Sequence, residues 1–175
     1  MIILKPPLTD KQVAGLKAGD KVLITGKIYT ARDAAHKRFA GKPPFAIKGQ
    51  IIYYASPTPA PPGAVIGSIG PTTASRMDAF APALYQAGLK ATIGKGDRGP
   101  EVVAALKKYK AVYLLVPGGT AAFLSKQVKK STVVAYPDLG PEAVLELAVV
   151  DFPAIVAIDS KGNSLFEIGK NQYRR

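Results

Sequence analysis

The sequence predicts an α/β fold in which a mixed sheet is flanked by helices. Short apolar runs of strand length alternate with helical patterns, which indicates a sheet built largely from β/α units. Near the C-terminus two further runs, at 153–158 and 165–168, flank a turn and predict a closing hairpin that makes the pairing mixed. A length of 175 residues, 47% of them hydrophobic, suits one domain over residues 1–175 with a single core.

The N-terminal part of the chain predicts two helices and two strands. Residues 9–12, Thr-Asp-Lys-Gln, have the spacing of a capping box and begin a short helix that ends at one of the next two glycines. An apolar run at 22–29 predicts a strand. A helix then runs from an N-cap at Thr30 to residue 39, and a second strand lies at 50–54.

The middle of the chain begins with a proline-rich run at 56–63, which excludes regular structure there. A linker between domains is an alternative, but only a small fragment would precede it, so we expect a rigid loop within one domain. A short strand is expected at 65–69 and a helix over 73–87 that ends before Gly88. Pro82 predicts that this helix is kinked or split in two.

The second half of the chain continues the alternation. Pro100 suits the first position of a helix that runs to residue 108. The continuous apolar run at 112–116 is typical of a strand buried on both faces. The remaining expected elements are strands at 91–93 and 132–136 and helices at 120–127 and 141–147.

Composition excludes several kinds of site. The chain has no cysteine, so it forms no disulfide and cannot ligate an iron–sulfur cluster by itself. Its single histidine does not favour a self-contained zinc site. No apolar run reaches the roughly 20 residues that span a bilayer, and the N-terminus lacks the pattern of a signal peptide. We therefore expect a cytoplasmic protein without membrane contact.

The net charge of +12 has two readings. It is compatible with a nucleic-acid partner, but the basic residues are spread along the chain and do not alternate with aromatic ones in a stacking pattern. A cleft that attracts dianionic substrates, or a basic face for an acidic partner, explains the charge equally well. Charge alone leaves these alternatives open.

The segment 70–78, Gly-Pro-Thr-Thr-Ala-Ser-Arg-Met-Asp, is the strongest candidate for an anion site. Thr72, Thr73 and Arg76 stand where a helix N-terminus offers unpaired N–H groups to a carboxylate or phosphate. The structural alternative is that one threonine caps the helix and Arg76 is solvated or pairs with an acid. Even then, one hydroxyl is enough for a cap, which leaves the other free for a ligand.

Two more basic segments are candidates for the same site. Arg32 and His36 are four residues apart, on one face of the expected helix, although Asp33 and Lys37 there also suit an ordinary surface ion pair. Lys95 lies in the glycine-rich loop 94–99 between a strand and a helix, which should direct it to the carboxyl-end edge of the sheet. The spacing of this loop is not that of a phosphate-binding or dinucleotide-binding motif. These residues predict an anion-binding half-site and no complete reaction centre.

Five strings, in order, cover most of the chain and resemble one family. They are GKIYTARDAAHKR, PTPAPPGAVIGSIGPTTASRMD, IGKGDRG, YPDLGPEAV and DFPAIVAIDSKGN. They resemble the β-subunit, or C-terminal region, of the iron–sulfur hydro-lyases of the class I fumarase and L(+)-tartrate dehydratase family. The resemblance implies a swivelling β/α domain that closes over a [4Fe–4S] cluster held by a partner α-subunit, within a higher oligomer of αβ units.

The same resemblance implies roles for individual residues. Arg32, Arg76 and Lys95 would bind the carboxylates of a C4 dicarboxylate, and Thr72 would contribute to proton transfer at the reacting carbon. Because a neutral threonine is a poor base, an α-subunit carboxylate is expected to assist it. His36 and Thr73 would position their neighbours, and no residue of this chain would bind metal.

One departure concerns the substrate. Ser75 stands where the family commonly has glycine, which puts the identity of the diacid in doubt more than the reaction class. The expected reaction is reversible hydration of fumarate to (S)-malate, with L(+)-tartrate dehydration as the alternative. A basic nucleic-acid-binding module and an inactive scaffolding relative are the alternatives from other classes.

Overall fold

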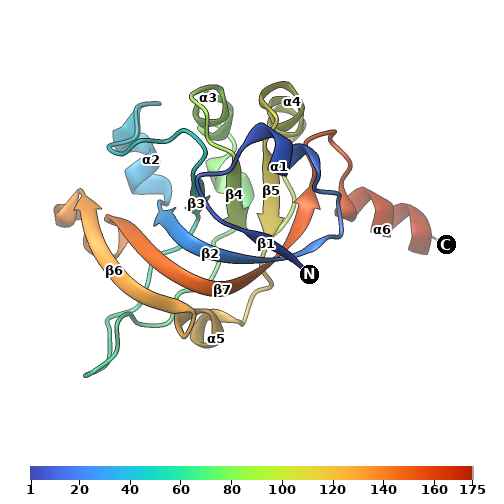
Figure 1. Cartoon of the computed structure of the whole chain (residues 1–175). Helices are drawn as coiled ribbons and strands as arrows, with labels where there is room; N and C mark the ends of the chain where they lie inside the picture. The colour runs from blue at the N-terminus through green and yellow to red at the C-terminus, as the bar shows by residue number, and fades with distance from the viewer. Residues whose placement is uncertain (175) are drawn as a thin grey trace.

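A computed structural model describes residues 1–174 and shows a seven-stranded mixed sheet with helices around it (Figure 1). The strands are β1 (Ile2–Leu4), β2 (Lys21–Thr30), β3 (Ile51–Tyr53), β4 (Ala91–Gly94), β5 (Val112–Leu115), β6 (Val128–Ala135) and β7 (Val144–Ile158). The α-helices are α1 (Asp10–Ala14), α2 (Asp33–Phe39), α3 (Ala81–Gln86), α4 (Pro100–Tyr109), α5 (Ala121–Ser125) and α6 (Leu165–Tyr173). Two 3₁₀ helices complete the set, η1 (Ala74–Met77) and η2 (Pro137–Glu142).

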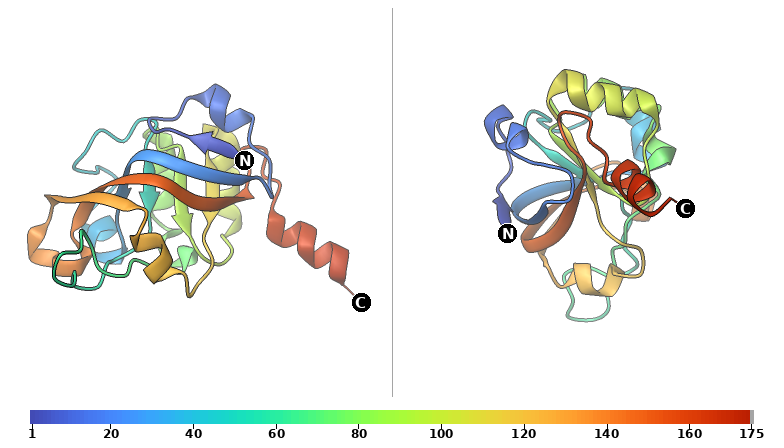
Figure 2. Two further views of the ribbon diagram at one scale, coloured as in Figure 1. Left: turned by 60° about the horizontal axis from the view of Figure 1, so that its bottom comes forward. Right: turned by 90° about the vertical axis from the view of Figure 1, so that its right-hand side faces the viewer.

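The sheet closes on itself through its longest strand. β1 to β5 lie side by side in chain order and are parallel, whereas β7 is antiparallel to β5, β6 and β2. Because β7 pairs with both β5 and β2, the strands β2, β3, β4, β5 and β7 form a closed ring. In the left view of Figure 2, β2 and β7 cross over β4 and β5. The predicted α/β class with a mixed sheet is confirmed.

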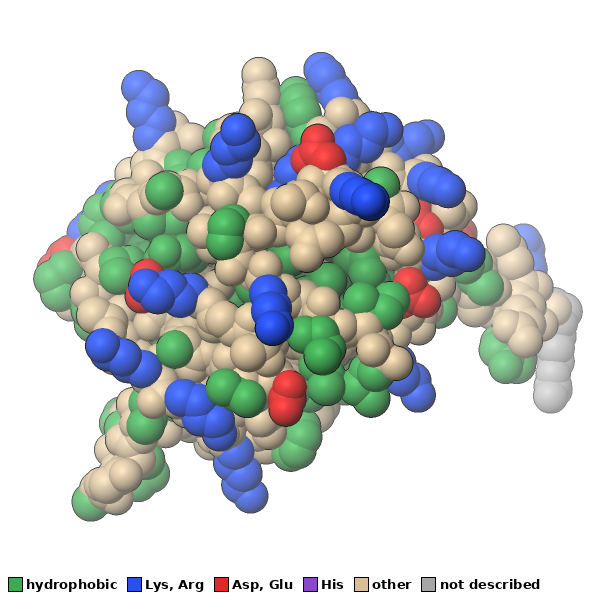
Figure 3. Space-filling model, viewed as in Figure 1, with side chains coloured by type: hydrophobic (Ala, Val, Ile, Leu, Met, Phe, Trp, Pro, Cys, Tyr) green, Lys and Arg blue, Asp and Glu red, His purple; other side chains and the backbone are tan. Residues whose placement is uncertain are grey.

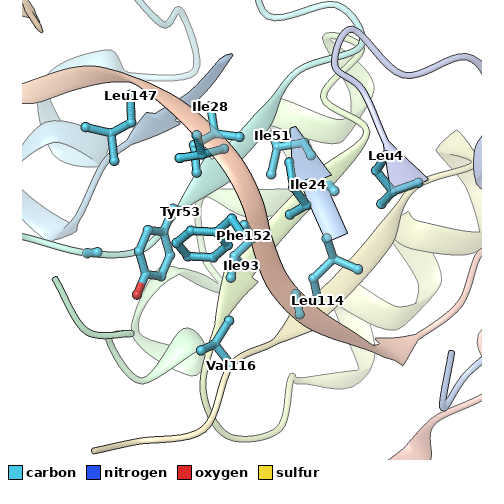
Figure 4. Close-up of a cluster of buried hydrophobic side chains, with 14 of the residues drawn as sticks. Leu4, Ile24, Ile28, Ile51, Tyr53, Ile93, Leu114, Val116, Leu147 and Phe152 are labelled. Atoms are coloured by element: carbon cyan, nitrogen blue, oxygen red, sulfur yellow. The ribbon is translucent and has the colours of Figure 1, made fainter. Parts of the chain in front are cut away.

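The interior of this ring is filled by apolar side chains from its strands (Figure 4). The Tyr53 and Phe152 rings lie edge to face, with centroids 5.3 Å apart, and the Tyr53 hydroxyl donates to the Ile69 carbonyl at 2.9 Å. A second apolar cluster, which includes Met77, Leu84 and Leu106, packs α3 and α4 against the outer face of the sheet. Full burial of each such side chain stabilises the fold by about 1.5–3 kcal/mol. Two apolar layers thus hold the strands whose ends carry the candidate site.

Several local signals act as predicted. Thr9 and Gln12 form the capping box, and Gly15 ends α1. Pro100 is the first residue of α4. The helix expected over 73–87 is indeed split, into η1 and α3, and Gly88 follows its end with a φ of +105°.

Thr30 does not cap a helix. It is the last residue of β2, and its hydroxyl accepts from the Leu145 N–H of β7 at 3.2 Å. Helix α2 therefore starts three residues later, at Asp33, with Arg32 in the N-cap position. Pairing with β7 extends β2 past the point where the local pattern predicts its end.

The strand expected at 65–69 is irregular in the structure. The Ser68 carbonyl accepts from Thr58 of the proline-rich loop, and the Ile69 N–H donates to Ala121 of α5. These backbone groups are satisfied by loops and a helix, so the segment has no need of a sheet partner. The proline-rich loop itself protrudes at the lower left of Figure 1 and is irregular, as predicted.

The C-terminal predictions are wrong in two places. The helix expected at 141–147 is absent, because the 3₁₀ helix η2 ends at Glu142 and the alternating buried pattern of β7 begins at Val144. The closing hairpin is absent among residues 1–174: its first arm is the end of β7, and its second arm is the first turn of α6, capped by Ser164. β7 itself supplies the mixed pairing that the hairpin was expected to provide. No helix within the described residues is long and apolar enough to cross a membrane.

Candidate functional site

The predicted site residues follow the carboxyl ends of neighbouring parallel strands. Arg32 comes two residues after β2, and Lys95 comes directly after β4. Between them, β3 ends at Tyr53, and its successor Tyr54 pairs with Thr72. The sheet therefore brings the predicted segments to one edge, where ligand sites of α/β proteins gather. The predicted position of Lys95 at this edge is confirmed.

The segment 72–74 is inserted between two strand ends. The Thr72 N–H donates to the Tyr54 carbonyl at 2.6 Å, and the Thr72 carbonyl accepts from the Lys95 N–H at 3.1 Å. The Ala74 N–H then donates to the Lys95 carbonyl at 2.9 Å. Gly94 permits this approach, since a Cβ there would lie 2.9 Å from the Ala74 Cβ. The backbone of Thr72 and Thr73 is thus fixed directly beside Lys95.

Neither threonine acts as a helix cap. η1 spans only Ala74–Met77, and its N-cap residue, Thr73, makes no capping hydrogen bond. The structural alternative, in which one threonine hydroxyl caps the helix, is not observed, because the backbone here follows the neighbouring strands instead of starting a long helix. Among the described residues neither the Thr72 nor the Thr73 hydroxyl has a hydrogen-bond partner, so both are available to a ligand.

The two arginines lie on either side of one carboxylate. The Arg76 Nε donates to Asp33 Oδ1 at 3.0 Å, and its Nη2 lies 2.8 Å from Oδ2. The Arg32 Nε lies 3.9 Å from the same Oδ2 and 3.2 Å from Glu142 Oε1. Asp33 therefore pairs with Arg76 across 43 residues of sequence, and the alternative of a local pair with Lys37 is not observed among the described residues.

Ion pairs compensate the charges of this cluster. Within residues 1–174, the Arg32 Nε and Asp33 Oδ2 are shielded from solvent and make no hydrogen bond of good geometry. Each still lies close to an opposite charge, because Oδ2 is 2.8 Å from the Arg76 Nη2 and the Arg32 Nε is 3.2 Å from Glu142 Oε1.

Lys95 contributes an unpaired positive charge. Its side chain is exposed and passes Gly118 in the loop after β5, where an added Cβ would be 3.9 Å from its Cδ. In the part of the chain that the structure describes, its ammonium group forms no ion pair. Among the predicted site residues, Lys95 thus supplies a cation without an ion pair, and the two arginines are held by carboxylates.

His36 is buried beneath Arg32. Its Nδ1 lies 2.8 Å from the Arg32 carbonyl oxygen, and because a carbonyl only accepts, Nδ1 carries the proton. Burial lowers the pKa of His36 to about 4, so the ring is neutral near pH 7. The rings of Phe39, Tyr54 and Phe80 surround it. His36 thereby holds the turn that presents Arg32.

A buried ion pair that the sequence did not indicate joins two of the segments. The Arg98 side chain is wholly buried, and its Nε donates to Asp78 Oδ1 at 2.6 Å. The other Asp78 oxygen accepts from the Gly99 N–H at 2.7 Å. The guanidinium lies over the rings of Tyr54 and Tyr113, 5.3 and 5.0 Å from their centroids. The signal available in the sequence was an aspartate in the segment 70–78 and an arginine in the segment 94–99, each among other charged residues.

Within residues 1–174, neither the apolar hollow of the chain nor its metal-binding types of side chain complete a reaction centre. A hollow of about 220 Å³ between β5, α5 and β7 is lined by apolar side chains and contains none of the predicted site residues. A [4Fe–4S] cluster requires thiolate ligands, and the chain has no cysteine. No group of three His, Asp or Glu side chains suited to a metal occurs among residues 1–174. The residues present do not fit the cluster.

Comparisons with known proteins give the family of the chain. The sequence model of a family described as Fumarase C-terminus matches residues 1–169. A Methanocaldococcus jannaschii protein, whose name is that of an L(+)-tartrate dehydratase subunit beta, is 43% identical, and the match covers 96% of this chain and 93% of that protein.

Fumarate hydratases are matched over a part of their length. Fumarate hydratase 2 of Leishmania major is 40% identical over 93% of this chain, and the anaerobic class I fumarate hydratase of Escherichia coli is 40% identical over 89%. In both cases the chain spans 30% of the length of the relative. The matched region corresponds to a whole subunit in one relative and to a portion of a longer chain in the others.

Proposed function

The chain belongs to the Fumarase C-terminus family, and from this we propose that it is the β-subunit of a two-part hydro-lyase that hydrates fumarate reversibly to (S)-malate. Its α-subunit would hold the [4Fe–4S] cluster, and several αβ units would assemble together. The domain would swivel to close over the partner. Near full-length similarity to a protein named as a beta subunit supports this division.

The main support for the proposal is that one edge of the sheet brings together the segments of four residues, Arg32, Thr72, Arg76 and Lys95. A C4 dicarboxylate presents two carboxylates, and guanidinium groups bind carboxylates through paired N–H donors. The Nε and Nη2 of Arg76 face Asp33, which leaves its outer N–H groups for a ligand. The net charge of +12 favours approach of a dianion.

Thr72 is proposed to take part in proton transfer at the reacting carbon. Thr72 is half-buried and its hydroxyl has no partner among the described residues, while its backbone is fixed on both sides. A neutral hydroxyl is a weak base, so a carboxylate of the α-subunit is proposed to accept the proton through it. His36 and Thr73 would position Arg32 and Thr72.

The test compares the isolated chain with the complex. We expect the purified chain to be colourless and inactive, and its anaerobic co-expression with a cysteine-bearing partner to give an oxygen-sensitive fumarate hydratase. Full hydratase activity of the chain alone would contradict the proposal.

L(+)-tartrate dehydration is the second candidate, because the relative matched over 93% of its length is named for it. The two substrates differ by one hydroxyl group. Ser75 is an exposed residue of η1, between Thr72 and Arg76 in the sequence. Turnover of fumarate, L(+)-tartrate and methylated fumarate by the same complex distinguishes these reactions.

A nucleic-acid partner is less well supported. On the face seen in Figure 3, lysines and arginines are distributed over the whole outline and do not gather into one stripe. Binding to DNA or RNA that weakens steeply with salt, and that depends on these scattered lysines, would favour that function instead.

A further inference from the structure

We propose that Asp33 is a positioning residue that orients Arg76 for the substrate carboxylate. It holds one edge of the guanidinium and leaves the opposite edge directed to the ligand. This inference rests on the proposed function, because it assigns Asp33 a part in recognising the same diacid.

The contact between the two residues is made along the side of the guanidinium. Nε donates to Oδ1 at 3.0 Å, and Nη2 lies 2.8 Å from Oδ2. A guanidinium has five N–H groups in a rigid plane, and two carboxylates can bind it at once, one along the Nε side and one at the Nη end. With Asp33 on the Nε side, Nη1 and the outer N–H of Nη2 remain for a substrate.

Asp33 is the fixed member of the pair. Its side chain is 25% exposed, whereas that of Arg76 is 50% exposed. Asp33 is the first residue of α2, and the Arg32 carbonyl before it accepts from both the His36 N–H and the His36 ring. A carboxylate anchored in this way restricts a long arginine side chain that would otherwise sample many rotamers. The Arg76 side chain then loses less conformational entropy when the substrate binds.

The opposite role, in which Asp33 competes with the substrate for Arg76, makes a contrary prediction. Asp33→Asn would then strengthen substrate binding for two reasons. It would free Arg76 for the substrate, and it would remove a negative charge near the site of a dianion. A positioning role predicts weaker binding despite this gain. The direction of the change in KM therefore separates the two roles.

The chain contains a matched control pair. Arg38 and Asp138 also form an arginine–aspartate contact, with Nη1 2.8 Å from both carboxylate oxygens. Both side chains are more exposed, at 42% and 62%, and neither contacts Arg32 or Arg76. Asp138→Asn removes the same charge and leaves the proposed site intact.

The first experiment measures KM and kcat of the assembled complex. Asp33→Asn should raise KM for fumarate and malate roughly tenfold with kcat within about twofold, since an interaction common to ground and transition states is weakened. In an Arg76→Lys background, Asp33→Asn should change KM less than about twofold, because its effect acts through the guanidinium. Asp138→Asn should leave both constants unchanged.

The second experiment needs no activity. In the isolated chain, NMR should show an Arg76 Nε–H signal protected from exchange with water, and Asp33→Asn should abolish that protection while Asp138→Asn preserves it. An unchanged or lower KM in Asp33→Asn, or an Nε–H signal unaffected by it, would overturn the inference. A wild-type complex without hydratase activity would instead refute the proposed function, and the NMR result would still report on the Asp33–Arg76 contact.

Discussion

Asp78 and Arg98 form a buried ion pair, with Nε and Oδ1 2.6 Å apart, that ties the segment 70–78 to the loop 94–99. The same carboxylate also accepts from the Gly99 N–H at the start of α4. Thr72, Arg76 and Lys95 all lie in the two segments joined by this contact. The pair therefore fixes the relative position of most of the proposed substrate-binding groups.

Asp78→Ala should lower the free energy of unfolding by about 3–5 kcal/mol, because it leaves the buried Arg98 guanidinium without its counter-ion. Urea unfolding of the isolated chain measures this change. Asp138→Ala, which breaks an exposed pair, should cost no more than about 1 kcal/mol. Equal losses in the two variants would show that the buried pair does not hold the two segments together.

Arg76→Ala should reduce kcat/KM of the assembled enzyme by roughly a hundredfold or more without unfolding the chain, because it removes a charged ligand to the substrate. The side chain is half exposed, so its loss leaves no cavity in the core. Steady-state kinetics and thermal unfolding together check both statements, with Arg38→Ala as the control. Wild-type turnover in Arg76→Ala would remove Arg76 from the site.

Gly94→Ala should destabilise the fold by about 1–3 kcal/mol, since an added methyl group is forced into a packed region. Its Cβ would lie 2.9 Å from the Ala74 Cβ and 3.2 Å from the Thr72 carbonyl oxygen. The segment that carries Thr72 would be displaced from Lys95. Gly169→Ala in α6 meets no atom within 4 Å and should be neutral or stabilising. A crystal structure of Gly94→Ala with the segment in place would contradict this expectation.

Stability should fall as the pH is lowered from about 6.5 toward 4, because of His36. Burial lowers the pKa of its ring to about 4, so in that window the unfolded chain takes up a proton that the folded chain excludes. The difference amounts to about 3 kcal/mol when it is fully developed. Carboxylates with lowered pKa values, such as Glu146 and Asp138, begin to lose their contributions only as the pH falls to their unfolded values of 4.5 and 3.8, at and below the lower end of this window.

Denaturant unfolding between pH 7 and 5 isolates the histidine. The wild type should lose stability over this range, and His36→Gln should lose much less. A folded-state NMR titration provides a second check. An imidazole that titrates near pH 6.5 in the folded chain would show that burial does not depress its pKa.

The predicted elements that the structure confirms are those with signals inside a single element. The capping box of Thr9, proline at the start of α4 and Gly88 after α3 each act within a few residues. β7 was missed because its identity as one 15-residue strand depends on pairing with β2, β5 and β6. Pro141 and Pro153 suggested separate short elements, and the long-range pairing overrode both.

In the candidate site, too, local motifs were predictable and long-range contacts were not. Arg32, Thr72, Arg76 and Lys95 were indicated by their motifs, and the sheet brings their segments to one edge. The partners of the arginines were not predictable, because Asp33 and Arg76 are 43 residues apart and Asp78 and Arg98 are 20 apart. No local spacing rule relates residues at such separations.

The most direct test of the central claim is an anaerobic titration of the cluster-bearing partner with this chain, followed by the rate of fumarate hydration. If the chain is half of the enzyme, the rate rises from zero with each addition and reaches a plateau at one chain per partner. Hydration by the partner without this chain, or no hydration at any ratio, would contradict the claim.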